Sequence, residues 1–313
     1  MQKQVVTITI NPALDRNTQV NQVAPNQKLR CDQPEREPGG GGINVSRAIR
    51  RLGGESLAIY PCGGPTGEMF KALLDEKRVN HQPTPIEGLT RENLTVFEKG
   101  SDRQYIVVMP GPELADPEWR RVLEALSGQD PAPDYVVASG SSPPGVPDDF
   151  YQRVAGLAQD LGSRLIVDTS GEPLRLAAEA GVFLLKPNMR ELGHLAGQEI
   201  ESEEHQIAAA RDLIEGGQAQ VVVVSMGAGG ALLVTEETGE HLRTPTVPIR
   251  SRLGAGDSMV AGIVLGLARG KTVRDAVRFG MAAGAAAVMT PGTELCRRGD
   301  TERLYERLAA EDA

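Results

Sequence analysis

The sequence predicts one α/β domain built on a doubly wound, mainly parallel sheet. Four short, continuous apolar runs have the form of strands that are buried on both faces. They lie at residues 135–138, 165–167, 182–185 and 221–224. Segments with helical character follow or separate them, at residues 149–161, 173–180, 189–195 and 203–215. Buried strands that alternate with helices indicate a parallel sheet covered by helices on both sides.

The N-terminal part of the chain follows this plan less regularly. Residues 5–10 alternate and are β-branched, so we expect a strand that ends at a turn. Residues 16–38 are polar and contain several prolines, which favours short strands or loops. A helix is expected at 43–52, ended by two glycines, followed by a strand at 57–60 and a helix at 68–76.

Two hairpins and a helical end complete the expected elements. Strands at 94–98 and 104–109 flank a Lys-Gly-Ser-Asp turn, and strands at 231–235 and 241–244 form an antiparallel edge. Helices are expected at residues 255–268, 273–289 and 301–310. Residues 1–313 thus form a single expected domain, in which the segments at about 15–36 and 90–110 make a small β lid outside the main alternation.

Composition and charge narrow the classes of partner. The formal net charge is −9 and the sequence pI is near 5.1, which argues against nucleic acid and membrane surfaces as partners. The three cysteines have no metal or disulfide spacing, which suits a reducing compartment. No apolar run has the pattern of a signal peptide or the length of a bilayer span. We therefore expect a cytoplasmic protein that acts on a small molecule.

A run of four glycines at 39–42 precedes Ile43 and Asn44. It does not fit G-x-G-x-x-G, because Asn44 and Val45 stand where the third glycine would be needed. No strand is expected before it, since residues 32–38 are polar and broken by prolines. No G-x-x-x-x-G-K-[ST] occurs either, which excludes a P-loop nucleotidase. The glycines leave unhindered backbone N–H groups at the N-terminus of the expected helix, where they could bind a polar ligand. A glycine run by itself is more often a flexible turn.

A second glycine turn, Gly-Ala-Gly-Asp-Ser at 254–258, opens an apolar helical segment. Free N–H groups and the helix dipole favour negative charge at such a position. Asp257 alone is also explained as a helix cap, worth roughly 1 kcal/mol. Its pairing with the upstream glycine run, and with Lys186-Pro187-Asn188 directly after a strand, favours a site for phosphate chemistry.

These motifs resemble a known family. The turn at 254–258 and the run at 39–45 resemble, in order and spacing, the two signatures of the PfkB/ribokinase family of sugar kinases. The resemblance extends over nearly the whole chain. Residues 28–31 (Lys-Leu-Arg-Cys), 108–111 (Val-Met-Pro-Gly) and 139–141 (Ser-Gly-Ser) make it most similar to the phosphosugar branch, that of the minor type of bacterial 6-phosphofructokinase.

The resemblance implies a ribokinase-like fold and ATP-dependent phosphorylation of fructose 6-phosphate to fructose 1,6-bisphosphate. Asp257 matches the family's general base, which takes the proton of the attacking hydroxyl. The amides of Gly254, Ala255 and Gly256 match its anion hole. ATP is implied to bind along Lys186, Asn188, Ser225, Gly227, Gly229 and Gly230.

The sugar phosphate is implied to bind between the two signatures and the lid. The sugar site comprises Asp15, Gly39, Gly40, Gly41, Gly42, Asn44 and Ser141. Without the resemblance, Asp15 would be explained as a turn residue after the first strand. Lys28 and Arg91, with Arg30 as a further candidate, are the cations for the substrate's phosphate, although an arginine at the start of a hairpin strand is otherwise a solvated surface residue.

Two metal ions are implied besides ATP. Asn188 and Glu191 lie three apart at a helix start, and in the family such a pair organises Mg²⁺, usually through water. A first-turn capping role explains Glu191 equally well. Ser251, Leu253 and Gly292 fall where the family has its K⁺ loops. The chain departs from the family there, with Ser-Arg-Leu at 251–253 and Thr-Pro-Gly-Thr-Glu at 290–294.

Three alternatives stay open at this stage. A 1-phosphofructokinase or a tagatose-6-phosphate kinase would share the base, the anion hole and the ATP site. A noncatalytic sugar-phosphate or nucleotide sensor would need no base, so the intact Asp257 speaks against it. A Rossmann dehydrogenase is disfavoured by the glycine spacing. Because a small sheet cannot bury a face alone, we also expect a homodimer through the lid.

Overall fold

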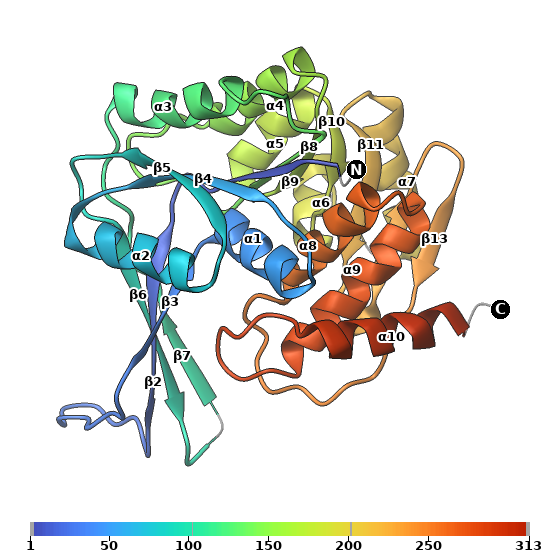
Figure 1. The fold of residues 1–313 in the computed structure, drawn as a ribbon. Coiled ribbons are helices and arrows are strands. Elements are labelled where there is room, and N and C mark those ends of the chain that lie inside the picture. Colours follow the sequence, from blue (N-terminus) through green and yellow to red (C-terminus); the bar gives the residue numbers. More distant parts are fainter. Residues whose placement is uncertain (1–2, 102, 201, 311–313) are drawn as a thin grey trace.

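The computed structural model describes residues 3–101, 103–200 and 202–310 (Figure 1). Its centre is a nine-stranded sheet in the order β13-β12-β11-β10-β9-β8-β1-β4-β5. Neighbouring strands are parallel except for the edge formed by β11, β12 and β13. The strands are β1 Val5–Ile8, β4 Leu57–Cys62, β5 Asn80–Pro85, β8 Tyr135–Ser139, β9 Arg164–Asp168, β10 Val182–Leu185, β11 Ala219–Ser225, β12 Ala231–Val234 and β13 Gly239–Leu242.

Helices cover both faces of this sheet. One face packs against α1, α8, α9 and α10, and the other against α3 to α7. The helices are α1 Gly41–Arg51, α2 Gly64–Glu76, α3 Asp116–Ser127, α4 Phe150–Asp160, α5 Gly171–Glu179, α6 Met189–Ala196, α7 Glu203–Glu215, α8 Ala255–Ala268, α9 Val273–Val288 and α10 Arg298–Ala310, with a 3₁₀ turn η1 Gly227–Gly229. The expected doubly wound α/β architecture is confirmed.

The parallel register brings the carboxyl ends of several strands together. Ser139 at the end of β8 pairs with Asp168 at the end of β9, and the Lys186 amide after β10 donates to the carbonyl of Val167. Asn188 forms an isolated bridge with Ser225 at the end of β11. Polar residues that lie far apart in the sequence therefore share one edge of the sheet, which is where α/β folds bind ligands.

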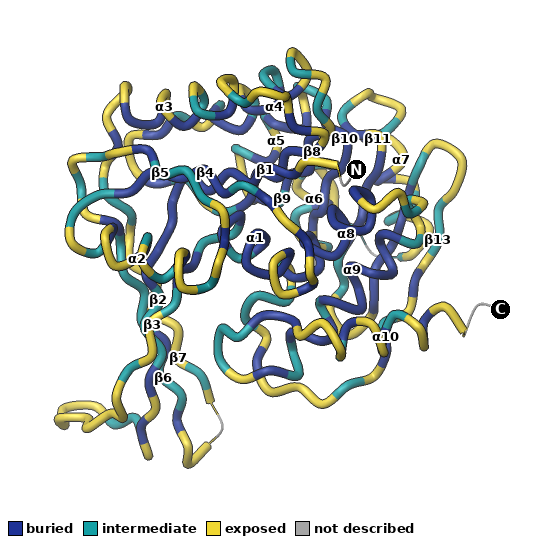
Figure 2. Tube along the Cα trace, viewed as in Figure 1, coloured by how far each residue is buried: buried dark blue, intermediate teal, exposed yellow. Residues whose placement is uncertain are grey.

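A second sheet of four strands, in the order β3-β2-β6-β7, projects from the body (Figures 1 and 2). It consists of β2 Ala13–Val20, β3 Glu35–Gly39, β6 Arg91–Glu98 and β7 Arg103–Val107. The two segments expected at about 15–36 and 90–110 thus pair with each other in this small sheet. The β6–β7 hairpin was expected, and Asp102 of its turn lies outside the described residues.

The expectation of no strand before the glycine run is wrong. Residues Glu35–Gly39 form β3, and β2 is a regular eight-residue strand rather than short pieces. Their polar sequences lack the continuous apolar runs of the main sheet because the small sheet is largely half-exposed (Figure 2). β3 runs antiparallel to β2, so the glycine run still does not belong to a parallel dinucleotide-binding unit.

Strand β5 was also not expected. Its sequence Asn-His-Gln-Pro-Thr-Pro contains two prolines, which an edge strand tolerates because one side of its backbone needs no partner. Within the part of the chain that the structure describes, no helix is both long enough and apolar enough to cross a membrane.

Candidate active site

Asp257 lies in the first turn of α8, in front of the polar strand ends. Burial raises its pKa to about 7, and the negative charge of Asp168 acts in the same direction. A hydrogen bond from Asn44 and the positive charge of Lys186 oppose this shift without cancelling it. A carboxylate with a pKa near neutrality can accept a proton and release it again, as a general base must.

The turn that carries Asp257 is shaped by Gly254. This residue caps α8 in the left-handed region, with φ of 72°, and a β-carbon there would lie 2.5 Å from Leu295 Cδ2. Only glycine fits both constraints. The first amides of α8 have no partner within the helix and carry the positive end of its dipole. The residues named from the sequence as an anion hole therefore present N–H groups beside Asp257.

The glycine run joins the small sheet to helix α1. Gly39 ends β3, Gly40 caps α1 with φ of 110°, and Gly41 and Gly42 are its first residues. A β-carbon on Gly39 would lie 2.0 Å from Asp15 Oδ2, and one on Gly41 would lie 2.3 Å from Ser139 Oγ. The glycines thus allow the backbone to lie against the Asp15 carboxylate and the end of β8.

Asp15 on β2 is held on the face of the small sheet that carries Gly39 and Asn93. Asn93 Nδ2 donates to Asp15 Oδ1 at 2.9 Å. Burial raises the pKa of Asp15, while this hydrogen bond and the charges of Arg47 and Arg91 limit the rise. Asp15 is therefore placed to accept hydrogen bonds from hydroxyl groups of a ligand.

Arg91, the first residue of β6, is fixed by two backbone carbonyls. Its Nη1 donates to Met109 O at 2.9 Å and its Nη2 to Asn11 O at 3.0 Å. Its Nε is buried and has no hydrogen-bond partner among the residues that the structure describes. Asn11 Nδ2 also lies 3.4 Å from Ser141 Oγ, so Arg91 and Ser141 share a neighbour. A cation and a hydroxyl are thereby brought close to the Asp15 side of the site.

Lys28 and Arg30 are not brought to this site within one chain. Both are exposed in the loop that joins β2 to β3. Asp15 lies at the base of β2, and the loop begins beyond Val20 at the free end of the small sheet (Figure 1). Five residues of a strand span about 16 Å, which separates the loop from Asp15.

Lys186 and Asp168 form an ion pair behind the α8 turn. Lys186 is 6% exposed, and its Nζ lies 3.0 Å from Asp168 Oδ1. Burial acts to lower the pKa of Lys186, but Asp168, Glu191 and Asp257 outweigh it, so the pKa is raised and the cation is retained. Asp168 was not singled out from the sequence. Its position at the end of a buried apolar strand was the available signal.

Asn188 and Glu191 form a reciprocal capping box at the start of α6. The Glu191 amide donates to Asn188 Oδ1 at 2.9 Å, and the Asn188 amide donates to Glu191 Oε2 at 2.8 Å. This geometry shows the capping role for both residues. In the described residues, no group of three or more His, Cys, Asp or Glu side chains is arranged to hold a metal ion.

The glycines after β11 differ in their surroundings. Gly227 and Gly229 are exposed on η1, next to Ser225 at the strand end. Gly230 is buried, and a β-carbon there would lie 2.1 Å from Leu242 O. The glycine at 230 is therefore explained by packing against β13.

The two loops that hold Ser251, Leu253 and Gly292 lie side by side. The amides of Arg250 and Ser251 donate to Val288 O at 2.7 and 3.3 Å, and the Leu253 amide donates to Ser251 Oγ at 3.2 Å. Gly292 adopts the left-handed region with φ of 58°. The loops meet beside the N-terminus of α8, where Gly254 contacts Leu295.

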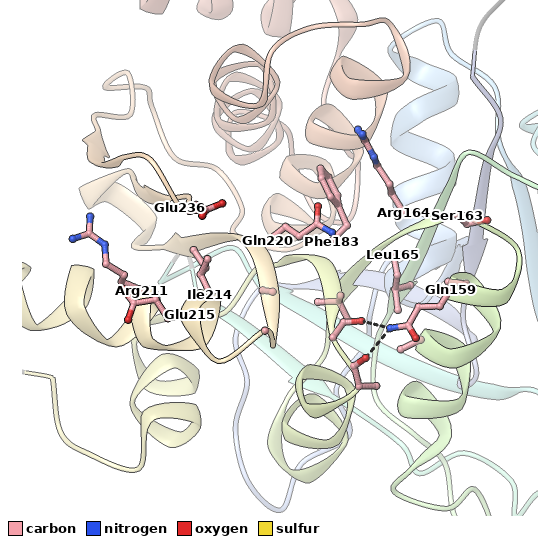
Figure 3. A pocket seen from close by; sticks show the side chains of 17 residues that line it. Gln159, Ser163, Arg164, Leu165, Phe183, Arg211, Ile214, Glu215, Gln220 and Glu236 are labelled. Carbon is pink, nitrogen blue, oxygen red and sulfur yellow. Dashed lines mark hydrogen bonds between the residues drawn. The ribbon is translucent and has the colours of Figure 1, made fainter.

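Two larger clefts are present, and Asp257 lines neither of them. One of about 950 Å³ lies between the small sheet and the 249–250 and 291–294 loops, and its lining includes Asn17, Glu37 and Thr293. The other, of about 760 Å³, is shown in Figure 3. It is lined by residues that begin β9, β10 and β11, at the opposite edge of the sheet from Asp257. Its lining contains none of the candidate site residues.

This fold and this site define a sugar kinase. Residues 3–298 match the model of the pfkB family of carbohydrate kinases, and the chain belongs to that family. It is 48% identical to ATP-dependent 6-phosphofructokinase isozyme 2 of Mycobacterium tuberculosis, over 98% of this chain and 90% of that protein. It is 35% identical to 1-phosphofructokinase of Bacillus subtilis, over 93% of this chain and 95% of that protein.

Solved structures of phosphofructokinase-2 from Escherichia coli superpose on nearly the whole chain. The complex with potassium has a TM-score of 0.94 at 42% identity, covering 98% of this chain and 99% of that one. The complex with fructose-6-phosphate has a TM-score of 0.91 at the same identity and coverage. The resemblance inferred from the sequence motifs is therefore confirmed at the level of the family.

Proposed function

We propose that this chain transfers the γ-phosphoryl group of ATP to fructose 6-phosphate and forms fructose 1,6-bisphosphate. The observation that carries the proposal is the Asp257 carboxylate, whose pKa is raised to about 7 at the N-terminus of α8. Asn44 donates a hydrogen bond to it, and the charges of Lys186 and Asp15 act on its pKa. A base close to a sugar-binding carboxylate and to a cation matches phosphoryl transfer to a hydroxyl.

In the proposed mechanism, Asp257 takes the proton of the sugar's 1-hydroxyl as its oxygen attacks the γ-phosphorus. The bond from the γ-phosphorus to the bridging oxygen breaks, and ADP leaves with the electron pair. The amides at the start of α8 receive the charge of the transferring group, and the ammonium of Lys186 lies beside them. Asp15 orients the sugar through its hydroxyl groups.

Arg91 and Ser141 would bind the phosphate that the sugar already carries. The guanidinium is positioned by two carbonyls before any ligand arrives, so little side-chain entropy is lost on binding. A neutral sugar would not use such a cation, whereas a phosphate gains charge-assisted hydrogen bonds from it. The relatives named as 6-phosphofructokinases favour the 6-phosphate isomer.

ATP, Mg²⁺ and K⁺ are the proposed cofactors. ATP would lie along Lys186, Asn188, Ser225 and η1. Mg²⁺, when bound, neutralises phosphate charge, and Glu191 would hold its water shell. A role through water suits this carboxylate, because one of its oxygens is engaged in the helix cap. K⁺ would be held by carbonyl oxygens of the loops around Ser251 and Gly292, as supported by the potassium complex of the E. coli relative.

A homodimer through the small sheet is also proposed. The edge strand β7 and the residues after it expose a continuous apolar run, comprising Tyr105, Ile106, Val107, Val108 and Met109. An exposed apolar edge strand invites pairing with another chain. Packing two small sheets together would also bring the exposed loop with Lys28 and Arg30 toward the site of the neighbouring copy.

The test is kcat/KM of the purified protein with Mg-ATP for five acceptors: fructose 6-phosphate, fructose 1-phosphate, tagatose 6-phosphate, free fructose and ribose. Fructose 6-phosphate should be preferred. A tenfold preference for fructose 1-phosphate or tagatose 6-phosphate would favour the second candidate, which the 1-phosphofructokinase relative supports. Sugar-phosphate binding without turnover would indicate a sensor instead.

A further inference from the structure

The amide of Asn44 is oriented by a contact on the side away from Asp257. Its Nδ2 donates to Asp257 Oδ2 at 2.9 Å, and its Oδ1 accepts from Arg47 Nη1 at 3.0 Å. A primary amide has one donating and one accepting end, whereas a guanidinium only donates. Arg47 on Oδ1 therefore keeps the NH₂ group of Asn44 directed at Asp257.

Arg47 is itself buried, and both of its terminal nitrogens have acceptors. It is 3% exposed and lies one turn further along α1. Its Nη1 also donates to Pro38 O at 2.7 Å, and its Nη2 lies 2.9 Å from Glu37 Oε1. A buried cation is stable only with such partners. Burial acts to raise the pKa of Glu37, but Arg47, Thr293 and Lys77 together hold it below its usual value, so the ion pair stays charged.

Glu37 is placed by parts of the chain that are far apart in the sequence. Thr293 Oγ1 donates to Glu37 Oε2 at 2.5 Å, and Asn17 Nδ2 donates to Thr293 Oγ1 at 2.7 Å. Asn17 belongs to β2 of the small sheet, and Thr293 to the loop between α9 and α10. The contacts behind the base thus connect α1 with the small sheet and with that loop.

We infer that Arg47, held in place by Glu37, is a positioning residue for the Asp257 base and acts through Asn44. The inference rests on the proposed role of Asp257. Without the guanidinium, Asn44 is free to rotate its carbonyl toward the carboxylate, and the hydrogen bond to Oδ2 is lost. The other charged groups that face Asp257 are Asp168 on β9, Lys186 after β10 and Asp15 on β2. Of these, Asp15 is also acted on by the charge of Arg47, which opposes the rise of its pKa by burial.

The test measures the pKa of Asp257 directly in the substrate-free protein, by ¹³C NMR of aspartate-labelled enzyme, with the resonance assigned from Asp257→Asn. The hydrogen bond from Asn44 stabilises the charged form, so its loss in Arg47→Met should raise the pKa by roughly 0.5–1 unit. The acid limb of the kcat pH profile should move upward by the same amount. Lys77→Met is the matched control: Lys77 Nζ lies 3.3 Å from Glu37 Oε1, whereas the side chain of Asn44 is hydrogen-bonded to Arg47 and Asp257.

The inference is overturned if folded Arg47→Met keeps the Asp257 pKa within 0.2 units of wild type, or if Lys77→Met shifts it equally. A rise in KM for the sugar alone would mean that Arg47 only anchors the end of β3 at Pro38. If Arg47→Met does not fold, Arg47→Lys replaces it, because an ammonium cannot reproduce the planar fork that reaches all three acceptors. The NMR measurement does not depend on turnover, so it tests the role of Arg47 even if the proposed reaction is wrong. A failure of the proposed reaction would be recognised separately, by normal activity of Asp257→Asn.

Discussion

Asn44 and Asp257 lie 213 residues apart in the sequence, yet Asn44 Nδ2 donates to Asp257 Oδ2 at 2.9 Å. This hydrogen bond joins the two glycine motifs, one at the start of α1 and the other at the start of α8. Both helices pack on the same face of the central sheet. The shared face places the glycine run and Asp257 against each other, and the activity proposed here depends on that contact.

Replacing Asp257 with Asn should reduce kcat by roughly 10²–10⁴, because the amide keeps the shape of the carboxylate but cannot accept a proton. ATP affinity, measured by calorimetry, should change little. Asp149→Asn is the matched control, since Asp149 also stands at a helix start but pairs with Arg153 on the surface. Turnover of Asp257→Asn within threefold of wild type would remove Asp257 from its assigned role.

The pH dependence of kcat/KM should show an acid limb centred near pH 7. The pKa of Asp257 is raised to about 7, so the base is charged and competent above that pH and becomes protonated as the pH falls through it. Activity should then fall about tenfold per pH unit. A sugar phosphate has its own ionisation near pH 6. A limb centred at 6 with no inflection near 7 would contradict the prediction.

Replacing Gly39 with Ala should weaken sugar binding strongly, because the new β-carbon would lie 2.0 Å from Asp15 Oδ2 and must displace that carboxylate. We expect KM for the sugar phosphate to rise at least about tenfold, on the scale of a lost hydrogen bond to a charged group. Gly156→Ala is the control: it lies in α4 with nothing within 4 Å of a β-carbon, and should be neutral or stabilising. An unchanged KM in Gly39→Ala would contradict a role of Asp15 in sugar binding.

Replacing Arg91 with Ala should raise KM for fructose 6-phosphate about ten- to a hundredfold, which corresponds to a lost charge-assisted hydrogen bond of about 1.5–3 kcal/mol. KM for ATP should hardly change. Initial rates at varied concentrations of each substrate measure this. Arg120→Ala on α3, where the arginine pairs with Asp116, provides a surface control. Equal effects on both substrates would argue against a phosphate-binding role.

Replacing Val108 with Asp should convert the proposed dimer to a monomer. Val108 is 63% exposed in the chain, so the change costs the isolated fold little but places a charge in the apolar surface beside β7. Light scattering at micromolar concentration measures the mass, and Met69→Asp, on the exposed face of α2, is the control. A wild-type protein that is monomeric and fully active would refute the dimer.

Most strands of the central sheet were predictable from the sequence, because a continuous apolar run such as residues 221–224 is stable only when both of its faces are buried. The helical pattern at 203–215 located the helix that precedes this strand. Strand β5, which is polar and contains two prolines, could not be found in this way. The sequence by itself also did not determine β2 and β3, whose polar residues suit a half-exposed small sheet as well as a loop. Asp257 and the glycine run could be identified from the sequence because glycine-rich turns at the start of a helix are visible as local motifs.

Which of these local features act together depends on the packing of segments that lie far apart in the sequence. Arg47 looks like any arginine on an amphipathic helix, and its burial against Glu37 depends on a strand that the sequence did not reveal. Asp168 becomes a candidate site residue only through its ion pair with Lys186, which follows the next strand along the chain. A local sequence pattern indicates the conformational preference of one segment. Hydrogen bonds between segments, and the pKa of a buried carboxylate such as Asp257, depend on distances that are set by tertiary packing.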